Sequence, residues 1–416
     1  MATDVRAANR GPGTIYAFLD SQVGRDILRR ELVEGALVQP GEQALLLCDA
    51  QAPEGTAEMV RVVGAMLREL GLQVISIQVD QVLPLRQGGL AGSFAHVDHH
   101  RLPPALYAAI QAADVIFDYS ASGRGAGKYN VDFYTLATYH GKRIYGRRLV
   151  EGPEALWSEN DPAGINTAAL LFPSDLLRVI ADRVNDTLVA AAEAGAEFRL
   201  TNPWGTDLRY HTLPGDICIP GGGIREYPRE ERFRGDDSYR LYRALAGCTL
   251  TQRCEGVWVT RYCTLLGGEL PEPMTVEWQD GFVVGARGGE GAAKLMAIVR
   301  DEPAGIHAIL MGLHPKAAPF RQGRYMLQNT GVAAGTAHLG VGGPGLFYRN
   351  GAWGGVGRNH FQVGNLPRIS LWAGAERVVD DGRLLALGDP AVREAARQYG
   401  DPDALLRQFE WPEAPL

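Results

Sequence analysis

The sequence lacks long uncharged apolar runs and any paired arrangement of cysteines. No stretch approaches the ~18 to 20 apolar residues that span a membrane, and no basic start followed by an apolar run opens the chain. The five cysteines include no C-x-x-C pair, which argues against a disulfide framework and against a cysteine-rich zinc site. We therefore expect a cytoplasmic protein with reduced thiols and no membrane partner.

Positive charge is also scarce. The 48 acidic residues outnumber the 41 basic ones and give a net charge of -7. The basic residues form no extended run, so the sequence lacks the electrostatic footprint of a nucleic-acid-binding protein. Lysine occurs only at positions 128, 142, 294 and 316. We expect a small molecule as the partner and no nucleic acid.

The chain has 416 residues, of which 46% are hydrophobic, and this is long enough for two globular domains. In its first part, short apolar runs alternate with a segment of helical apolar spacing over residues 56–70. This alternation is typical of a parallel sheet with crossover helices, and it predicts an α/β domain over residues 1–195. The strands are expected at Gln43–Asp49, Gln73–Val79, Ala113–Tyr119 and Lys142–Gly146.

The pattern changes after a long helix expected over Ser174–Ala194. Alternating residues and turn pairs then dominate, such as Asp280-Gly281 and Asp381-Gly382. We therefore expect a second, mostly antiparallel β (α+β) domain over residues 196–416. One helix is expected within it at Glu290–Arg300, and two short helices between residues 390 and 409.

Histidines are the most informative residues of this second domain. Four of them stand at the ends of apolar or glycine-rich segments, at His307, His314, His338 and His360. Imidazoles that converge from separate strands are how a β-rich domain builds a metal site. A further group, His96 to His100, falls in an expected loop, and a solvated turn is the favoured interpretation there.

The segments around these histidines resemble, in order, motifs of the metallo-aminopeptidases related to aminopeptidase T. Gly312–Pro315 is similar to that family's Gly-Leu-Asn-Pro stretch, and Gly335–His338 is similar to its Gly-Thr-Val-His segment. Gly354-Gly355 followed by His360 resembles the family's glycine pair and His-x-Asp metal motif. The resemblance covers roughly residues 197–390 and implies that the second domain binds metal.

Two positions depart from the family pattern. The aminopeptidases bridge two metals with acidic side chains, whereas the residues on either side of His307 carry no carboxylate, and Gln362 stands where the motif has Asp. The resemblance therefore favours the family's one-metal members, which act on small aromatic rings. It implies one divalent transition metal (Mn, Co, Fe or Zn) bound by His307, His338 and His360.

Three activities follow from the resemblance. The chain is most similar to 5-nitroanthranilic acid aminohydrolase, which replaces a ring amino group by hydroxyl, and next to the 2,5-dihydroxypyridine dioxygenases. A neutral ligand set leaves the ion its full double charge for an anionic, chelating substrate, which favours the hydrolase. An Fe(II)-dependent ring-cleaving dioxygenase is the first alternative, and a metallo-aminopeptidase is the second.

The same segments hold candidate catalytic and substrate-binding residues. His314 and Gln362 lie close to the expected metal ligands in sequence and are the candidate catalytic residues. We expect a small aromatic acid as substrate, and a first domain that closes the site and assembles the chain into a homo-oligomer, as in the relatives. Cationic, amide and aromatic groups suited to such a substrate are Arg324, Tyr325, Asn329, Thr330 and Arg358, with Arg287 and Lys316 as further cations.

Overall fold

The structure is a computed structural model, and it divides into two compact units. It describes residues 19–30, 32–33, 36–49, 54–79, 104–119, 143–146, 172–212, 217–218, 245–249, 252–263, 268–301, 303–316, 333–342, 347–349, 352–354 and 360–410. For some positions within these ranges only the backbone is described, among them His307, His338, His360 and Gln362.

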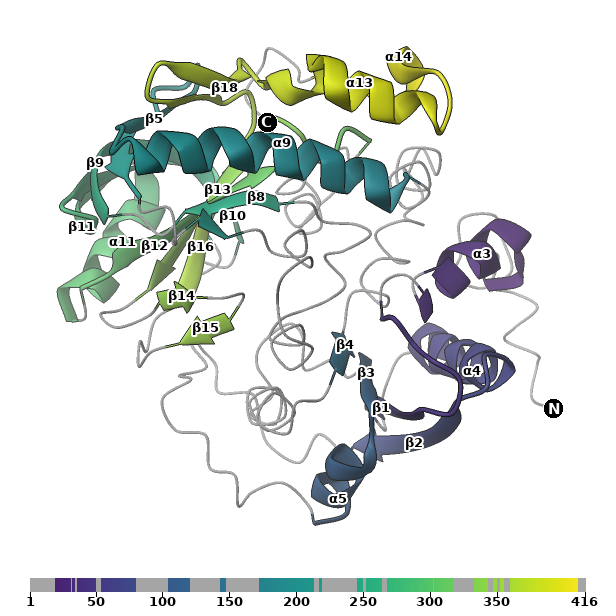
Figure 1. The fold of residues 1–416 in the computed structure, drawn as a ribbon. Helices are drawn as coiled ribbons and strands as arrows, with labels where there is room; N and C mark the ends of the chain where they lie inside the picture. The colour runs from purple at the N-terminus through teal and green to yellow at the C-terminus, as the bar shows by residue number, and fades with distance from the viewer. Residues whose placement is uncertain are drawn as a thin grey trace. The chain divides into compact units, whose positions relative to one another are not determined.

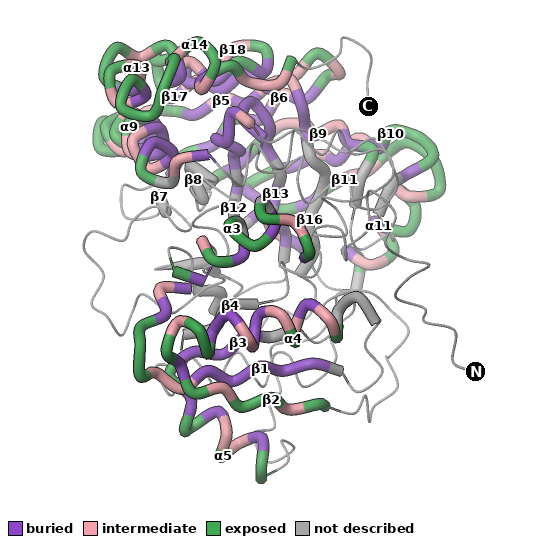
Figure 2. The backbone as a smooth tube through the Cα atoms, turned by 90° about the vertical axis from the view of Figure 1, so that its right-hand side faces the viewer, coloured by how far each residue is buried: buried purple, intermediate pink, exposed green. Residues whose placement is uncertain are grey.

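The smaller unit is built on a parallel sheet, as the sequence predicts. Its four strands lie in the order β2-β1-β3-β4, and each pair is parallel. Leu45 and Leu47 of β1 pack against Ile110 of α5, whereas Leu46 lies on the side of α4, next to Gly64. The central strand is therefore buried on both faces (Figure 2), as is usual for parallel sheets. The described elements are α3 (Gln22–Arg30), β1 (Gln43–Asp49), α4 (Glu54–Glu69), β2 (Gln73–Val79), α5 (Pro104–Ala112), β3 (Val115–Tyr119) and β4 (Arg143–Gly146).

The larger unit is built on an antiparallel sheet of thirteen strands. Its main path runs β10-β11-β12-β13-β16-β9-β6-β5-β17-β18-β19, with β8 paired to β12 and β7 paired to β8. A separate pair is formed by β14 (Phe347–Arg349) and β15 (Ala352–Gly354). The strands of the large sheet are β5 (Phe198–Thr201), β6 (Asp207–His211), β7 (Ile217–Cys218), β8 (Leu245–Thr249), β9 (Gln252–Cys263), β10 (Gly268–Gln279), β11 (Phe282–Arg287), β12 (Gly305–Gly312), β13 (Ala337–Gly342), β16 (His360–Leu366), β17 (Ser370–Ala373), β18 (Glu376–Asp380) and β19 (Arg383–Leu384).

Helices cover this sheet. The long helix α9 (Ser174–Glu193) buries Leu177, Ile180 and Val184 in the same core as the strands, and α13 packs beside it (Figure 1). The expected first domain, residues 1–195, includes this helix, whereas its packing assigns it to the larger unit. The remaining helices are α11 (Gly289–Asp301), the 3-10 helix η8 (Leu385–Gly388), α13 (Pro390–Arg397) and α14 (Pro402–Leu405).

The two predicted Asp-Gly hairpins are present. Asp280 and Gly281 join β10 to β11, and Asp381 and Gly382 join β18 to β19. Both residues of each pair have positive φ, at 51° and 82° in the first turn and 45° and 83° in the second. Such turns match the twist of the strands that they connect, and Asp-Gly adopts them readily.

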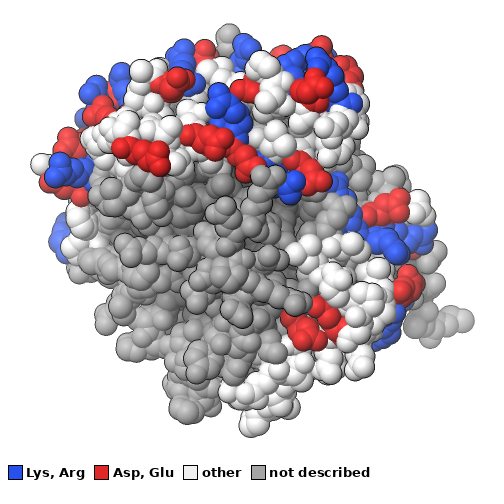
Figure 3. Space-filling view, viewed as in Figure 1, with Lys and Arg blue, Asp and Glu red and all other residues white. Residues whose placement is uncertain are grey.

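Acidic and basic side chains alternate over α9, α13 and β18 on the face seen in Figure 3, so neither sign of charge dominates there. The helix α9 also forms ion pairs, Arg183 with Asp389 and Arg178 with Asp175. Among the described residues, no helix combines the length and the apolar composition that crossing a membrane requires.

Candidate active site

Three neighbouring strands of the larger unit carry the predicted metal ligands. His307 belongs to β12, His338 to β13 and His360 to β16, and β13 lies between the other two strands. In the register, Gly340 of β13 is opposite Ala308 on one side and Gln362 on the other. Backbone pairing therefore brings together segments that are up to 53 residues apart in sequence.

Residue alternation places several of these positions on one face of the sheet. Ala337, Leu339 and Val341 of β13 are buried in the core, so His338, Gly340 and Gly342 occupy the opposite face of the strand. Across β16, Gln362 is opposite Gly340 and His360 is opposite Gly342, which puts both positions on that same face. Because Gly340 and Gly342 have no side chains, β13 presents no side chain at these two positions of that face.

His307 is the extra residue of a β-bulge. Ile306 pairs with Val341 and Ala308 pairs with Gly340, so His307 stands between two pairs without an opposite residue of its own. Bulges redirect a side chain and occur often beside active sites. His338 and His360 lie four residues apart along β13, roughly 13 Å. His307 and Gln362 lie between them, next to Gly340.

Two of the motifs that carry the family resemblance are bonded to each other. The Gly312 amide donates to the Thr336 carbonyl at 3.0 Å, and the Ala334 amide donates to the His314 carbonyl at 3.0 Å. The Thr336 hydroxyl donates to the Ala333 carbonyl at 2.8 Å and closes the turn that precedes β13. The stretch that ends β12 and the stretch that begins β13 thus form one hydrogen-bonded unit.

His314 is fully buried within this unit. Its Nδ1 accepts a hydrogen bond from the Lys316 amide at 3.1 Å, and its ring lies 5.2 Å from that of Phe172. An Nδ1 atom that accepts from an N–H carries no proton, so the neutral ring holds its proton on Nε2. Burial favours a positioning role for this histidine over direct contact with a substrate.

Gly335 begins the segment that leads to His338, and it fits tightly against a distant hairpin. Its φ is +82°, and an added Cβ atom would lie 1.8 Å from the Gly382 carbonyl oxygen. The Gly335 carbonyl accepts from the Ile369 amide at 3.3 Å, and the Gly382 amide donates to the Ile369 carbonyl at 2.7 Å. Only glycine allows this approach of the two chain segments.

Two further cations of the sequence analysis have structural partners. The Lys316 ammonium donates to the carbonyl of Ala404 in α14 and to that of Arg407, two residues after the helix ends. Arg287 is largely exposed and lies 3.6 Å from Glu277. The other predicted binding residues lie outside the described residues, namely Arg324, Tyr325, Asn329, Thr330 and Arg358.

One position that the sequence analysis missed shares the face of the histidines. Asn365 is opposite His338, because Gly364 is an extra residue in β16 between the pairs formed by Val363 and Asn365. A glycine inside a strand pattern is a signal for such a bulge. The sequence alone, however, does not show that β13 is the partner of β16. It therefore does not show on which face of the sheet a residue after Gly364 lies.

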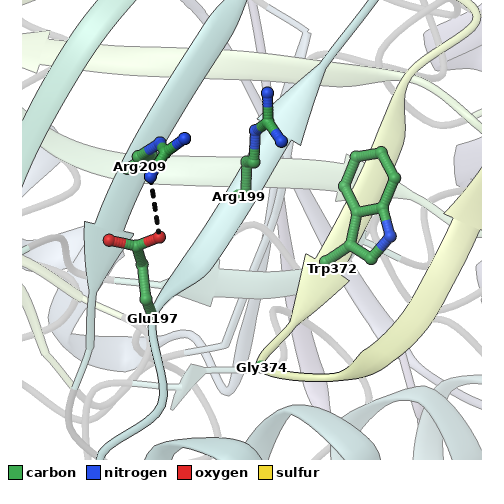
Figure 4. A pocket seen from close by; sticks show the side chains of 5 residues that line it. All are labelled: Glu197, Arg199, Arg209, Trp372 and Gly374. Atoms are coloured by element: carbon green, nitrogen blue, oxygen red, sulfur yellow. Dashed lines mark ion pairs between the residues drawn. The ribbon is translucent and has the colours of Figure 1, made fainter.

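A hollow of about 340 Å³ opens elsewhere on the larger unit, lined by Glu197, Arg199, Arg209, Trp372 and Gly374 (Figure 4). Arg199 makes two hydrogen bonds to Asp207, at 2.8 and 2.9 Å, which lower the pKa of that carboxyl group. Arg209 pairs with Glu197 at 3.7 Å. The hollow is separated from β16 by β9 in the sheet order, and it contains none of the predicted site residues.

The side chains that the structure describes include no group of three or more His, Cys, Asp or Glu arranged to hold a metal. The side chains of His307, His338 and His360 are not among them. Their assignment as ligands thus depends on register and residue type.

Comparison with known proteins identifies the fold. No family model matches the sequence, and no curated protein matches it. Among solved structures, the chain is similar to 2,5-dihydroxypyridine dioxygenase from Pseudomonas putida KT2440, with 17% identity and a TM-score of 0.59 over 86% of this chain and 96% of that one. It is also similar to wild-type AmpT from Thermus thermophilus, with 14% identity and a TM-score of 0.57 over 89% of this chain and 100% of that one.

The chain has a distant aminopeptidase T-like fold. The similarity covers 96% and 100% of the two solved proteins, nearly their whole length. At 14% and 17% identity the similarity shows the fold alone, and the activity has to be argued from the residues of this chain.

Proposed function

We propose that this chain is a metal-dependent enzyme that binds one divalent transition metal (Mn, Co, Fe or Zn) through His307, His338 and His360. The observation that carries the proposal is the register of β12, β13 and β16, in which these positions and Gln362 surround Gly340. Similarity to a fold that includes a dioxygenase and AmpT supports enzyme status.

The donor types fit such an ion. Neutral imidazole is a common ligand of divalent transition metals, Fe and Zn among them, and the ring can be fixed by a hydrogen bond at its other nitrogen. Position 362 offers an amide in place of a carboxylate, and Ile306 and Ala308 offer no oxygen donor. This set lacks the bridging carboxylates that a second metal would need, so we propose a single ion.

We further propose that the reaction is the hydrolytic deamination of an aromatic ortho-aminocarboxylate of the 5-nitroanthranilate type. When bound, the metal would lower the pKa of a water molecule and attract the substrate's anionic groups. Water adds its oxygen to the ring carbon that carries the amino group, the carbon–nitrogen bond breaks, and the products are the ring hydroxyl compound and ammonia. A nitro group on the ring accepts the negative charge that builds up during attack.

The chain's own residues would bind and orient this substrate. Arg324 and Arg358 are proposed to pair with its carboxylate and nitro oxygens, while Asn329, Thr330 and Gln362 donate hydrogen bonds to the same groups. Tyr325 is proposed to pack against the ring. His314, which is buried, is proposed to hold the Gly312–Lys316 turn in place.

Turnover without oxygen distinguishes the candidate reactions. We expect the purified protein, loaded with Mn or Co under anaerobic conditions, to release ammonia from 5-nitroanthranilate at one equivalent per substrate consumed. Oxygen-dependent consumption of 2,5-dihydroxypyridine with ferrous iron would instead support the dioxygenase alternative. Release of amino acids from peptides with two bound metals would support the aminopeptidase.

Metal content tests the ligands directly. We expect about one equivalent of metal in the wild-type protein and its loss in His360→Ala. His211→Ala is the matched control, because His211 is an exposed histidine on β6 of the same unit. Full metal content in His360→Ala would rule out His360 as a ligand.

A further inference from the structure

The C-terminal segment from Pro402 to Gln408 contacts the turn that holds His314 and the hairpin against which Gly335 packs. It consists of α14 and the three residues that follow it. Leu406 is 5% exposed and belongs to the core of the larger unit, so the segment is anchored there. Besides the ion pair of Asp403 with Arg393 of α13, it makes polar contacts to two other parts of the chain.

The first contact runs through Lys316. The Lys316 ammonium donates to the Ala404 carbonyl at 2.5 Å and to the Arg407 carbonyl at 2.9 Å. Carbonyl groups at a helix C-terminus have no partners within the helix, so a cation there satisfies them. The backbone amide of the same lysine donates to His314 Nδ1 at 3.1 Å. Lys316 thus connects the end of α14 to the turn that holds His314.

The second contact runs through Gln408. Its side-chain carbonyl accepts from the Leu384 amide at 2.9 Å, and its side-chain amide donates to the Gly382 carbonyl at 2.5 Å. Gln408 therefore contacts both the turn of the β18–β19 hairpin and its second strand. The Gly382 carbonyl is the atom against which Gly335 packs, and Gly335 lies three residues before His338.

We infer that residues 402–408 form a clamp that fixes the Gly312–Lys316 turn relative to the Gly335–His338 segment, with Lys316 and Gln408 as its positioning residues. The two segments are bonded to each other through the amides of Gly312 and Ala334. The clamp contacts the turn directly through Lys316, and it supports the other segment through the β18–β19 hairpin, against which Gly335 packs. The effect of the clamp on metal binding rests on the proposed function, because His338 is a proposed ligand. The effect of the clamp on the order of the backbone does not depend on that function.

Amide hydrogen exchange tests the clamp without reference to metal. In Lys316→Met and Gln408→Leu, combined in one protein, we expect exchange at the Ala334 and Gly312 amides to accelerate about tenfold or more. The Val276 amide in β10 reports on global stability and should change less. Arg397→Ala is the matched control, since it removes only an exposed ion pair with Glu394 on α13.

Conservative variants sharpen the test. The Gln408→Glu side chain can still accept from the Leu384 amide, but as a carboxylate it cannot donate to the Gly382 carbonyl. The rate of amide hydrogen exchange near Gly335 should therefore rise even though the contact to Leu384 persists. Lys316→Arg keeps a cation at the end of α14, and it should retain protection at Ala334 better than Lys316→Met does.

Metal affinity provides the second measurement. If the wild type binds one equivalent, we expect the double variant to bind it about tenfold more weakly, a loss typical of groups that orient metal ligands. A wild type that binds no metal would overturn the proposed function, and the exchange rates would still decide the clamp. Exchange at Ala334 and Gly312 that rises no more than at Val276 would overturn the clamp.

Discussion

At the scale of single residues, Gly335 shows how closely the site segment is packed. Its conformation has φ of +82°, and a methyl group there would meet the Gly382 carbonyl at 1.8 Å. We expect Gly335→Ala to lower the free energy of unfolding by about 3 kcal/mol or more, through combined backbone strain and steric overlap.

Gly195→Ala separates the two causes. Gly195 has φ of +65° but no atom within 4 Å of an added Cβ, so only the backbone strain of about 1 kcal/mol should appear. Urea unfolding of both variants measures the difference. Equal losses would show that the Gly335 segment moves away from Gly382 without cost.

Cys254 is the residue whose titration should be visible at alkaline pH. Burial, with a smaller effect from the Glu255 charge, raises the pKa of its thiol from 9.0 to about 12. The unfolded chain can therefore ionise this thiol at a pH where the folded chain cannot. Its contribution to stability is complete below pH 9 and is lost as the pH rises toward 12.

We expect Cys254→Ala to abolish the loss of folding stability that ionisation of this thiol causes at alkaline pH. The stability difference between wild type and variant should narrow from pH 8 to pH 11, as measured by urea unfolding at each pH. The comparison cancels other groups that titrate in the same range, since both proteins contain them. A difference that stays constant with pH would show that the thiol is accessible to water in the folded chain.

At the scale of helices and strands, local pattern predicted most bounds. Strands β1 and β2 span Gln43–Asp49 and Gln73–Val79, as expected from apolar runs, and α11 exceeds the expected helix by one residue at each end. The parallel sheet and both Asp-Gly hairpins are also confirmed. These features depend on residues close together in sequence, where periodicity and turn chemistry decide the conformation.

Features set by distant partners could not be predicted in the same way. The bulges at His307 and Gly364 exist only relative to β13, and they decide which residues share a face with His338. The Lys316 ammonium, a candidate for substrate binding by sequence, bonds to carbonyls 88 and 91 residues away. The choice of site segments came from the order of the motifs, while the ligand assignments stay a prediction.

Asp389 joins two helices and offers a test at this scale. It caps α13 by accepting from the Ala391 amide at 2.8 Å, and it accepts from Arg183 of α9 at 2.6 Å. We expect Asp389→Ala to cost about 1 kcal/mol, mainly from the lost cap. The hydrogen bond from Arg183 lowers the pKa of Asp389 in the folded chain. The stabilisation that depends on the ionised Asp389 carboxylate is therefore present above its unfolded-state pKa of 3.8 and is lost as the pH falls below that value.

Unfolding at two pH values checks this expectation. The destabilisation by Asp389→Ala should be full at pH 7 and much smaller near pH 2. Asp175→Ala is a suitable control, because Asp175 also pairs with an arginine of α9 but accepts no capping bond among the hydrogen bonds described. An effect of Asp389→Ala that is the same at both pH values would exclude the ionised carboxylate as its cause.

At the scale of the whole molecule, the described residues of the two units belong to different apolar clusters. Leu45, Ile110 and Ile116 belong to the core of the smaller unit, whereas the core of the larger unit includes α9 and the strands that carry the proposed ligands. His307, His338 and His360 all belong to the larger unit. Metal binding and the stability of the smaller unit should therefore be separable.

Leu45→Ala tests this separation. Leu45 is fully buried, so its truncation should cost the smaller unit about 3 kcal/mol through lost burial and a cavity. Because the proposed ligands lie in the larger unit, the variant should still bind about one equivalent of metal at a temperature where both units remain folded. Leu371→Ala, on β17 of the larger unit, is the counterpart and should destabilise the unit that contains those ligands. If Leu45→Ala abolished metal binding while the larger unit stayed folded, the smaller unit would have to supply part of the site, as the sequence-based expectation of a closing first domain requires.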